Sequence, residues 1–554
     1  MHGMAPPAKG SRREGWLTGS IKRGCSRIKR SKILEGCRRN EAACGSLDLS
    51  WRSPNWFHCA AAAGRAGNGF PYGYASVDAT PLYIIASADY VTESGDASFA
   101  HQKWDSLWKA YEFLRSTYDS QGLPQNFGFG HGWVEGGPLL PVKAEFYQSG
   151  LGAQALAALS SLAHSAGKDD VSQQLAKEFA EKKQQLDQSF WSAESGSYAF
   201  ALDNNNQKVI EPSVLATVPM WFGLLDHNRA NSMITRLAGP DHQTDWGMRI
   251  ISSHASRYDA GGYHYGSVWP LFTGWASVGE YRYHRVLPAY SNLRANALLA
   301  LDGSLSHVTE VLSGDYYQPL STSSPHQIWS SAMVISPLLR GLSGLETDAT
   351  GHKVVFAPHL PADWTKFAIH HVRTGDAVLD FSYRKTLDEI MLDIQSSAPS
   401  ELEFSPALSL RAQVISVEVN GRRAPFRVQI SDSDQHVVVH APLSKGKSTL
   451  RIRVRNDFGV SIASSLPPLG SSSRGLRVIS ESWSALHDIL TLDVTGAART
   501  EYELTIWNPG QIASVDGAEL KNGKLTVRIP ASGTEAYPRE KILVHFRGST
   551  TRKR

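Results

Sequence analysis

Apolar residues recur at helical spacing along the chain from about residue 71 to residue 344. Nine segments show this period, at 78–91, 98–118, 147–167, 170–191, 211–225, 227–239, 266–284, 287–303 and 324–342. Asp169, which opens DDVSQQLAKEF, is typical of a helix cap, and several segments end on Gly. Short turns alternate with long aromatic loops, so the pattern predicts helical hairpins in an α/α toroid or solenoid with one functional face.

The pattern changes to period two after residue 351. Alternating apolar residues predict strands in 352–360, 367–385, 389–397, 414–430, 436–443 and 449–457, and again in 476–483, 489–496, 502–508 and 519–529. The dipeptide Asn420-Gly421 predicts a two-residue hairpin turn. SLPPLGSSSRG (465–475) reads as a linker between two β-sandwich modules.

These changes divide the chain into four expected parts. Residues 1–60 lack periodicity and are expected to be disordered or foreign to the fold. Residues 61–345 form the helical domain, 346–456 a β-sandwich module, and 472–548 a second β module. The fold class expected is therefore a mainly α toroid followed by all-β sandwich modules.

Charge is distributed unevenly. Residues 1–40 hold eleven Lys or Arg against two Glu, a net charge of +9, which leaves −5 for the rest of a chain whose total is +4. A mildly acidic body argues against nucleic acid as a partner. No run of eighteen apolar residues occurs, so no membrane span is expected.

The four cysteines all lie in the first 59 residues, at spacings that match no zinc motif. The first 50 residues lack the apolar core of a signal peptide. The sequence leaves the compartment unknown: cytoplasmic, or periplasmic or secreted if the true N-terminus is missing.

Four segments occur in a fixed order: YGYASVDATPLYIIASADYVTESGD (72–96), HGWVEGG (131–137), the loop 245–275 with GYHYGSVWP, and 304–332 with TEVLSGDYYQPL…HQIWSS. Together they resemble the glucosidase domain of the amylo-α-1,6-glucosidase (glycogen-debranching) family, within the six-hairpin glycosidases. The resemblance implies an (α/α)6 barrel over residues 72–345 that hydrolyses a carbohydrate with inversion.

Two features depart from that family. Its Trp-x-Asp segment reads Trp133-Val134-Glu135 here. The family's barrel also begins earlier, with further helices and a Trp-Gly-Arg-Asp-like stretch that this sequence lacks. Nine helices where a closed toroid needs twelve indicate an incomplete barrel and a truncated N-terminus.

Inversion needs one carboxyl group that protonates the leaving oxygen and another that deprotonates water, roughly 6.5–9.5 Å apart. The motif order assigns these roles to Glu135, beside the apolar Trp133, and to Glu310, on a polar loop. Glu145 is the reserve acid, or a substrate contact. The alternative interpretation is a solvated loop glutamate for Glu135 and a helix-terminal glutamate for Glu310.

The resemblance also suggests which residues contact the sugar. The candidates are Asp78, Trp133, Glu145, Tyr263, His264, Trp269, Gln327 and Trp329. Asp78 also occupies the position of a helix cap, and the aromatic candidates could equally be packing residues. The loop after Glu310 is expected to wall the sugar subsite with Tyr316 and Tyr317.

Other functions remain open. A mannosylglycerate- or glucosylglycerate-type six-hairpin hydrolase would share both carboxylates, and Arg249 and Arg257 are the arginines near the motifs that could mark an acidic substrate. A non-catalytic carbohydrate-binding fragment is an alternative of another class. No phosphate loop or Ser-His-Asp order occurs, and no carboxylate spacing accompanies His264 or His326, so neither cofactor nor metal is expected.

Overall fold

The computed structural model describes residues 76–126, 132–134, 138–531 and 535–548. The expectations for residues 1–60, including the four cysteines, lie outside the described residues. Within the described ranges, no helix is both long and apolar enough to cross a lipid bilayer.

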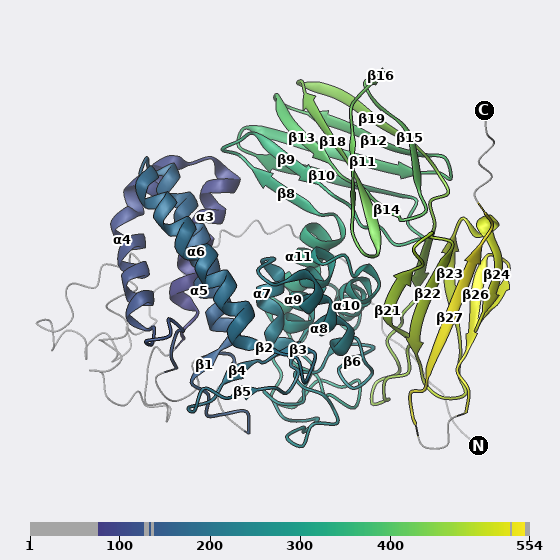
Figure 1. Cartoon of the computed structure of the whole chain (residues 1–554), viewed down its shortest axis with the longest axis horizontal. Helices are drawn as coiled ribbons and strands as arrows, with labels where there is room; N and C mark the ends of the chain where they lie inside the picture. The colour runs from purple at the N-terminus through teal and green to yellow at the C-terminus, as the bar shows by residue number, and fades with distance from the viewer. Residues whose placement is uncertain (1–75, 127–131, 135–137, 532–534, 549–554) are drawn as a thin grey trace, which may run out of the picture. The chain divides into compact units, whose positions relative to one another are not determined.

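The helical domain contains the expected helices (Figure 1). They are α3 (Ala79–Ser94), α4 (Ala97–Ser116), α5 (Phe146–Ser165), α6 (Asp169–Phe190), η1 (Val214–Thr217) running into α7 (Val218–Trp221), α8 (His227–Leu237), α9 (Pro270–Arg282), α10 (Val286–Leu299) and α11 (Ile328–Ser336) continued by η2 (Pro337–Leu342). The segment 211–225 is shorter than expected as a helix, because the chain is extended before Ser213 caps η1. Strand pairs of this domain, such as β1 (Ala144–Glu145) with β4 (Ala201–Leu202), are antiparallel wherever they are described.

The helices of this domain differ in how much of their surface is buried. Helix α5 is apolar on all sides and buried along most of its length, whereas α6 buries only one stripe, through Leu175, Leu186 and Phe190. Helix α3 packs on α5, α5 on α7, α7 on α9 and α9 on α11, and we call these five the inner helices; α4, α6 and α10, the outer helices, pack against them. A helical domain is therefore confirmed, and its closure into a toroid stays a prediction.

Two expected caps are wrong. Helix α6 starts at Asp169 itself, so Asp169 and Asp170 lie in the first turn, where their charge favours the helix dipole without capping it. Asp78 does occupy the N-cap of α3, but its side chain makes no capping hydrogen bond, because it accepts from Tyr147 instead.

The first β module packs two sheets around one core of mainly branched and aromatic side chains. One sheet has the order β10-β11-β12-β19-β15-β16 and the other β14-β18-β13-β9-β8 with β17 on β18. Their bounds are β8 (Leu345–Asp348), β9 (Lys353–Phe356), β10 (Lys366–Thr374), β11 (Ala377–Lys385), β12 (Glu389–Ser396), β13 (Ser400–Phe404), β14 (Ala407–Ser409), β15 (Gln413–Val419), β16 (Arg422–Arg423), β17 (Arg427–Ile430), β18 (Asp434–Leu443) and β19 (Gly446–Arg455). Asn420 and Gly421, both at positive φ, form the expected two-residue turn.

The second module likewise contains two sheets, but each has four strands, in the orders β20-β23-β26-β25 and β21-β22-β27-β24 (Figure 1). Its strands are β20 (Gly459–Ile462), β21 (Arg477–Trp483), β22 (Ile489–Thr495), β23 (Glu501–Trp507), β24 (Ile512–Asp516), β25 (Glu519–Lys521), β26 (Lys524–Arg528) and β27 (Arg539–Phe546). Strand β20 comes from the stretch between the two expected modules and pairs with β23. Part of the segment that joins the two β modules therefore belongs to a sheet of the second module.

Candidate active site

The candidate residues gather where the inner helices begin. Asp78 immediately precedes α3, Glu145 precedes α5, Trp269 precedes α9 and Gln327 precedes α11, each at the N-cap position. These positions are far apart in the sequence but equivalent in the hairpin pattern. We call this end of the helical domain the rim.

Trp133 is the hub of an aromatic cluster at the rim. Its ring meets those of Trp269, Phe272, Trp275 and Trp329 edge to face, with centroids 5.6–6.3 Å apart. Such edge contacts are the geometry that ring quadrupoles favour. Three predicted residues, Trp133, Trp269 and Trp329, therefore lie together.

Trp269 is buried within this aromatic cluster. Its side chain is buried, and its indole N–H donates to the backbone oxygen of Tyr263 at 2.9 Å. The Tyr263 ring packs on it at 4.7 Å, and the His264 ring stacks at 6.1 Å. Burial lowers the pKa of His264 to about 4, so this imidazole is neutral at physiological pH.

Glu145 is a buried carboxyl group with fixed partners. It is 3% exposed, and Asn126 donates to its Oε1 at 3.0 Å. The backbone N–H of Gly132 also bonds to it, and a Cβ at Gly132 would overlap its Oε2. Burial, with a smaller contribution from the charge of Asp78, raises the pKa of Glu145 to about 7, although the hydrogen bonds from Asn126 and Gly132 act in the opposite direction.

Tyr147 connects Asp78 to the start of α5. Tyr147, two residues after Glu145, donates its hydroxyl to Asp78 Oδ2 at 2.8 Å. The Tyr147 ring stacks on Trp275 with centroids 5.6 Å apart. Tyr147 therefore joins Asp78 to the aromatic cluster. The sequence did not predict this role, and its one signal is the position of Tyr147 at the start of α5.

Glu310 is held by the far end of its own loop. Its backbone N–H donates to the Ser324 oxygen at 2.9 Å, and the Ser324 N–H donates to Glu310 Oε2 at 3.1 Å. Gln327 Nε2 lies 3.5 Å from Oε1. The fourteen irregular residues after Glu310 thus fold back to fix a carboxylate that is only 8% exposed.

Neighbouring loops brace this segment. Val268 and Leu312 form a β-bridge, and the indole N–H of Trp246 donates to Ser313 at 3.0 Å. Arg249 is buried and donates through Nε to the Gly314 oxygen at 2.7 Å. Arg249 therefore supports the loop rather than marking an acidic substrate.

The tyrosines after Glu310 do not both face a subsite. Tyr317 is buried against Trp246 and donates its hydroxyl to Asp302, so the expectation that it walls a sugar is wrong. Its backbone pairs with the linker, through hydrogen bonds to Ser471 and from Gly470. Tyr316 is exposed.

Several buried polar atoms of the rim lack a hydrogen-bond partner among the described residues. They include the indole nitrogens of Trp133 and Trp329, which are donors, and Asn126 Oδ1 and Gln148 Oε1, which are acceptors. Buried polar groups are normally satisfied, so such a cluster requires an explanation. A cavity of about 1040 Å³, lined in part by Trp133, Tyr147 and Trp275, adjoins it.

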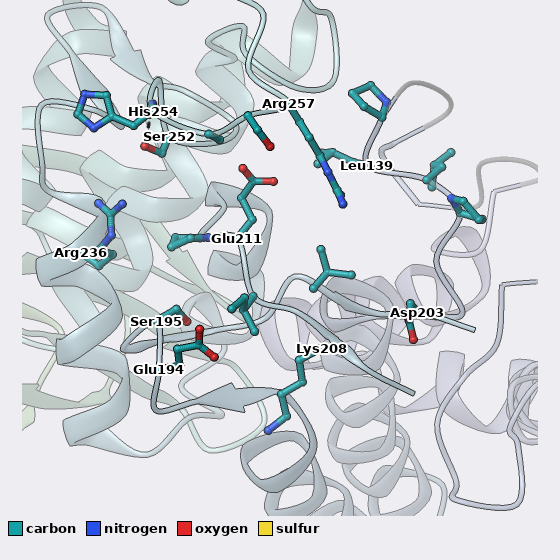
Figure 2. Close-up of a pocket in the computed structure, with 18 of the residues that line it drawn as sticks. Leu139, Glu194, Ser195, Asp203, Lys208, Glu211, Arg236, Ser252, His254 and Arg257 are labelled. Atoms are coloured by element: carbon teal, nitrogen blue, oxygen red, sulfur yellow. Dashed lines mark hydrogen bonds between the residues drawn. The ribbon is translucent and has the colours of Figure 1, made fainter. Parts of the chain in front are cut away.

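A second cavity, of about 1010 Å³, opens among the segments that lead into α5, η1 and α9. Figure 2 shows Glu211 and Arg257 extending into it from different loops. Burial raises the pKa of the Glu211 carboxyl, and Arg257 partly offsets this. Glu211 was not predicted as a site residue; it lies two residues before Ser213, the N-cap of η1.

Glu135 lies outside the described residues, next to Trp133 and Val134. The expected separation of its carboxyl group from that of Glu310 therefore stays a prediction. Of the other candidates, Trp133, Trp269, Trp329, Tyr263 and His264 share one cluster. Tyr147 links Asp78 to this cluster, and Gln327 lies between Glu310 and Trp329.

Part of the helical domain matches a known protein domain. Residues 144–320 match the mannosylglycerate hydrolase MGH1-like glycoside hydrolase domain. The chain therefore contains a glycoside hydrolase domain, as the sequence predicted. The match covers less than half of the chain, and no curated protein matches.

Solved structures show weaker similarity. An α-L-rhamnosidase from Dictyoglumus thermophilum is 12% identical, with a TM-score of 0.48, over 72% of this chain and 43% of its own. A sialidase is 14% identical, with a TM-score of 0.49, over 70% and 35%. The GH63 mannosylglycerate hydrolase from Thermus thermophilus in complex with glucose is 14% identical, with a TM-score of 0.39, over 50% and 78%. This chain spans less than half of the first two.

Proposed function

We propose that this protein is an inverting glycoside hydrolase whose rim binds one sugar unit of a small α-linked glycoside. The observation that carries the proposal is the convergence of carboxylates and tryptophans at the starts of the inner helices. Unpartnered donors and acceptors at the same place fit a ligand rich in hydroxyl groups, because a hydroxyl both donates and accepts.

Glu310 is the proposed base. It would take a proton from water while the water oxygen attacks the anomeric carbon and the bond to the leaving oxygen breaks. Its hydrogen bonds from Ser324 and Gln327 fix the orientation of the carboxylate, as a base aimed at one water molecule requires.

The acid that protonates the leaving oxygen is Glu135 in this proposal, on the order of the motifs. Glu145 is the competing candidate, because burial raises its pKa to about 7 and a protonated carboxyl can donate at neutral pH. The contact with Gly132 favours a different role for Glu145, that of holding the segment that leads to Glu135.

Two variants separate these roles. Loss of the acid lowers kcat most for substrates with poor leaving groups and least for activated aryl glycosides, because only the former need the proton. We expect this split for Glu135→Gln. For Glu145→Gln we expect a similar loss on both substrate types. The reverse pattern would assign the acid to Glu145.

For the substrate, α-glucosidic oligosaccharides are proposed from the motif resemblance. A second candidate is a glycoside of a small acid such as glycerate, favoured by the MGH1-like match and by the exposed Arg257 beside the second cavity. Arginine is suited to bind a carboxylate.

The test is a screen of both substrate classes on the full chain, with the product anomer followed by NMR. Inversion at the anomeric carbon is expected, and retention would refute the proposed mechanism. Arg257→Gln should raise KM for glycosylglycerates but not for neutral α-glucosides, whereas Arg384→Gln, on the exposed face of β11, should change neither. No turnover of any glycoside by the folded chain would favour a binding fragment.

A further inference from the structure

Three histidines and one aspartate meet away from the rim, where the helical domain contacts the first β module. His284 lies in the turn after α9, His359 follows β9, and Asp434 and His436 open β18. One ligand atom of each residue lies within 4.8 Å of the others. We call these four residues the histidine cluster.

The distances within the cluster fit a small tetrahedral ion. His284 Nδ1 is 2.8 Å from Asp434 Oδ1, and His359 Nε2 is 3.0 Å from His436 Nε2. Both Nε2 atoms lie 3.7 Å from Asp434 Oδ2. Ligands about 2.0–2.1 Å from a tetrahedral zinc ion lie about 3.3 Å from one another, within the range observed.

The protonation pattern also favours an ion. The Nδ1–H of His436 donates to the Ser405 oxygen at 2.6 Å, so the Nε2 of a neutral His436 carries a lone pair. A backbone acceptor on the far nitrogen is the usual support of a metal-binding imidazole. Asp434 Oδ2, although buried, has no hydrogen-bond partner among the described residues.

A proton shared by His359 and His436 is the competing explanation. It would account for the 3.0 Å between their Nε2 atoms, but it would leave Asp434 Oδ2 without a donor. A divalent cation satisfies all three atoms at once. A cavity of about 110 Å³, lined in part by His284, His359 and Asp434, gives an ion a way in.

The backbone holds these ligands in place without the ion. Asp434 and His436 are two apart on a strand and so share one face. Strand β14 pairs with both, through Ser409 and Ala407. His284 has a positive φ of 61°, rare for a residue other than Gly, and Ser433 donates to its backbone oxygen at 2.6 Å.

We propose that His284, His359, Asp434 and His436 bind a structural zinc ion that fastens the α9–α10 turn to the first β module. Imidazole-rich sets with one carboxylate favour zinc over calcium or magnesium, which prefer oxygen ligands. Four protein ligands fill the tetrahedron, as in structural rather than catalytic sites. The proposal is independent of the proposed hydrolase activity.

The test uses the full chain, freed of any affinity tag and of metal, and titrated with Zn²⁺ and Co²⁺. We expect zinc to raise the thermal unfolding midpoint by about 5 °C, and calcium or magnesium to have no effect. Bound Co²⁺ should give the visible spectrum of a tetrahedral nitrogen and oxygen site. It should lack the thiolate charge-transfer band that Cys25, Cys37, Cys44 or Cys59 would produce.

Variants then locate the site. His436→Gln and Asp434→Asn should each abolish the zinc-dependent shift, whereas His440→Gln, exposed on the same strand β18, should retain it. The spectrum of the wild-type chain decides the matter even if a cluster variant fails to fold. A wild-type chain that binds zinc only through thiolates, or whose midpoint zinc leaves unchanged, would overturn the proposal.

Discussion

The rim and the histidine cluster both contain buried polar side chains with atoms that lack a hydrogen-bond partner. The two groups differ in which atoms these are and in how much space surrounds them. At the rim the unpartnered atoms include indole donors and amide acceptors beside a cavity of about 1040 Å³. In the histidine cluster, four possible ligand atoms lie within 4.8 Å of one another, and the unpartnered Asp434 Oδ2 is an acceptor. Mixed donors and acceptors with room around them suit a hydroxyl-rich molecule, whereas an unpartnered carboxylate oxygen among imidazole nitrogens suits a cation. The kind of atom left unpaired therefore indicates the kind of ligand.

Glu310→Gln should have the largest effect, and only at the rim. Removing a general base lowers kcat by about 10²–10⁴-fold, while sugar binding and zinc binding should persist. Steady-state kinetics and calorimetric binding of the product measure the two effects. Glu401→Gln, exposed on β13, is the matched control. An active Glu310→Gln enzyme would remove Glu310 from the mechanism.

Glu145→Gln should change how stability depends on pH. The pKa of Glu145 is about 7 in the folded chain and near 4.5 when unfolded, so the folded state binds more protons between these values. The free energy of unfolding therefore falls as pH rises through this window, by up to about 3 kcal/mol for this group.

Urea unfolding at pH 5 and pH 8 measures this difference. Glu145→Gln should reduce the fall in the free energy of unfolding between pH 5 and pH 8, which we call the slope. It should not abolish this slope, because burial also raises the pKa of Glu280 and Glu481 to about 7. Glu280→Gln should reduce the slope similarly while leaving turnover unchanged. An unaltered slope in Glu145→Gln would show that this carboxyl group is ionised in the folded state at neutral pH.

Trp133→Phe should weaken sugar binding moderately. It keeps most of the ring packing but removes an N–H, and one hydrogen bond contributes about 0.5–1.5 kcal/mol, or up to roughly tenfold in KM. Trp104→Phe, on the outer helix α4, is the control. Equal KM values for wild type and Trp133→Phe would exclude this N–H from the contacts to sugar.

Removing metal should have the smallest effect on turnover. If the ion is structural, the chelated enzyme at about 25 °C should keep its kcat within about twofold while its unfolding midpoint falls. Initial rates before and after chelation provide the measurement. A complete loss of kcat, restored by zinc, would place a metal in the reaction and abolish the contrast between the two clusters.

The sequence predicted the element types well because hydrophobic period reports burial directly. It failed where a side chain has a choice of partners. Asp78 stands at a cap position but bonds Tyr147, and Tyr317 stands in a polar loop but packs on Trp246. Neither choice leaves a local signal, since the deciding partner lies elsewhere in the chain.

The same reason explains what the sequence could not reveal at all. The histidine cluster draws on a turn, a loop and a strand spread over more than 150 positions, with no spacing motif beyond Asp434 and His436. In contrast, the rim residues fall at repeated positions before helices, so ordered motifs could locate them.

The linker 465–475 has a consequence for how such a chain can be divided. Asp245 of the helical domain accepts hydrogen bonds from the backbone of Arg474 and Gly475 and pairs with the buried Arg477. Residues 470–472 run beside Tyr316 and Tyr317. A chain truncated after the first β module would leave Asp245 without its hydrogen-bond and ion-pair partners. It would also expose one side of the loop that holds Glu310. The modules are therefore poor units for recombination: a swap at the visible boundary would carry away part of the neighbouring site.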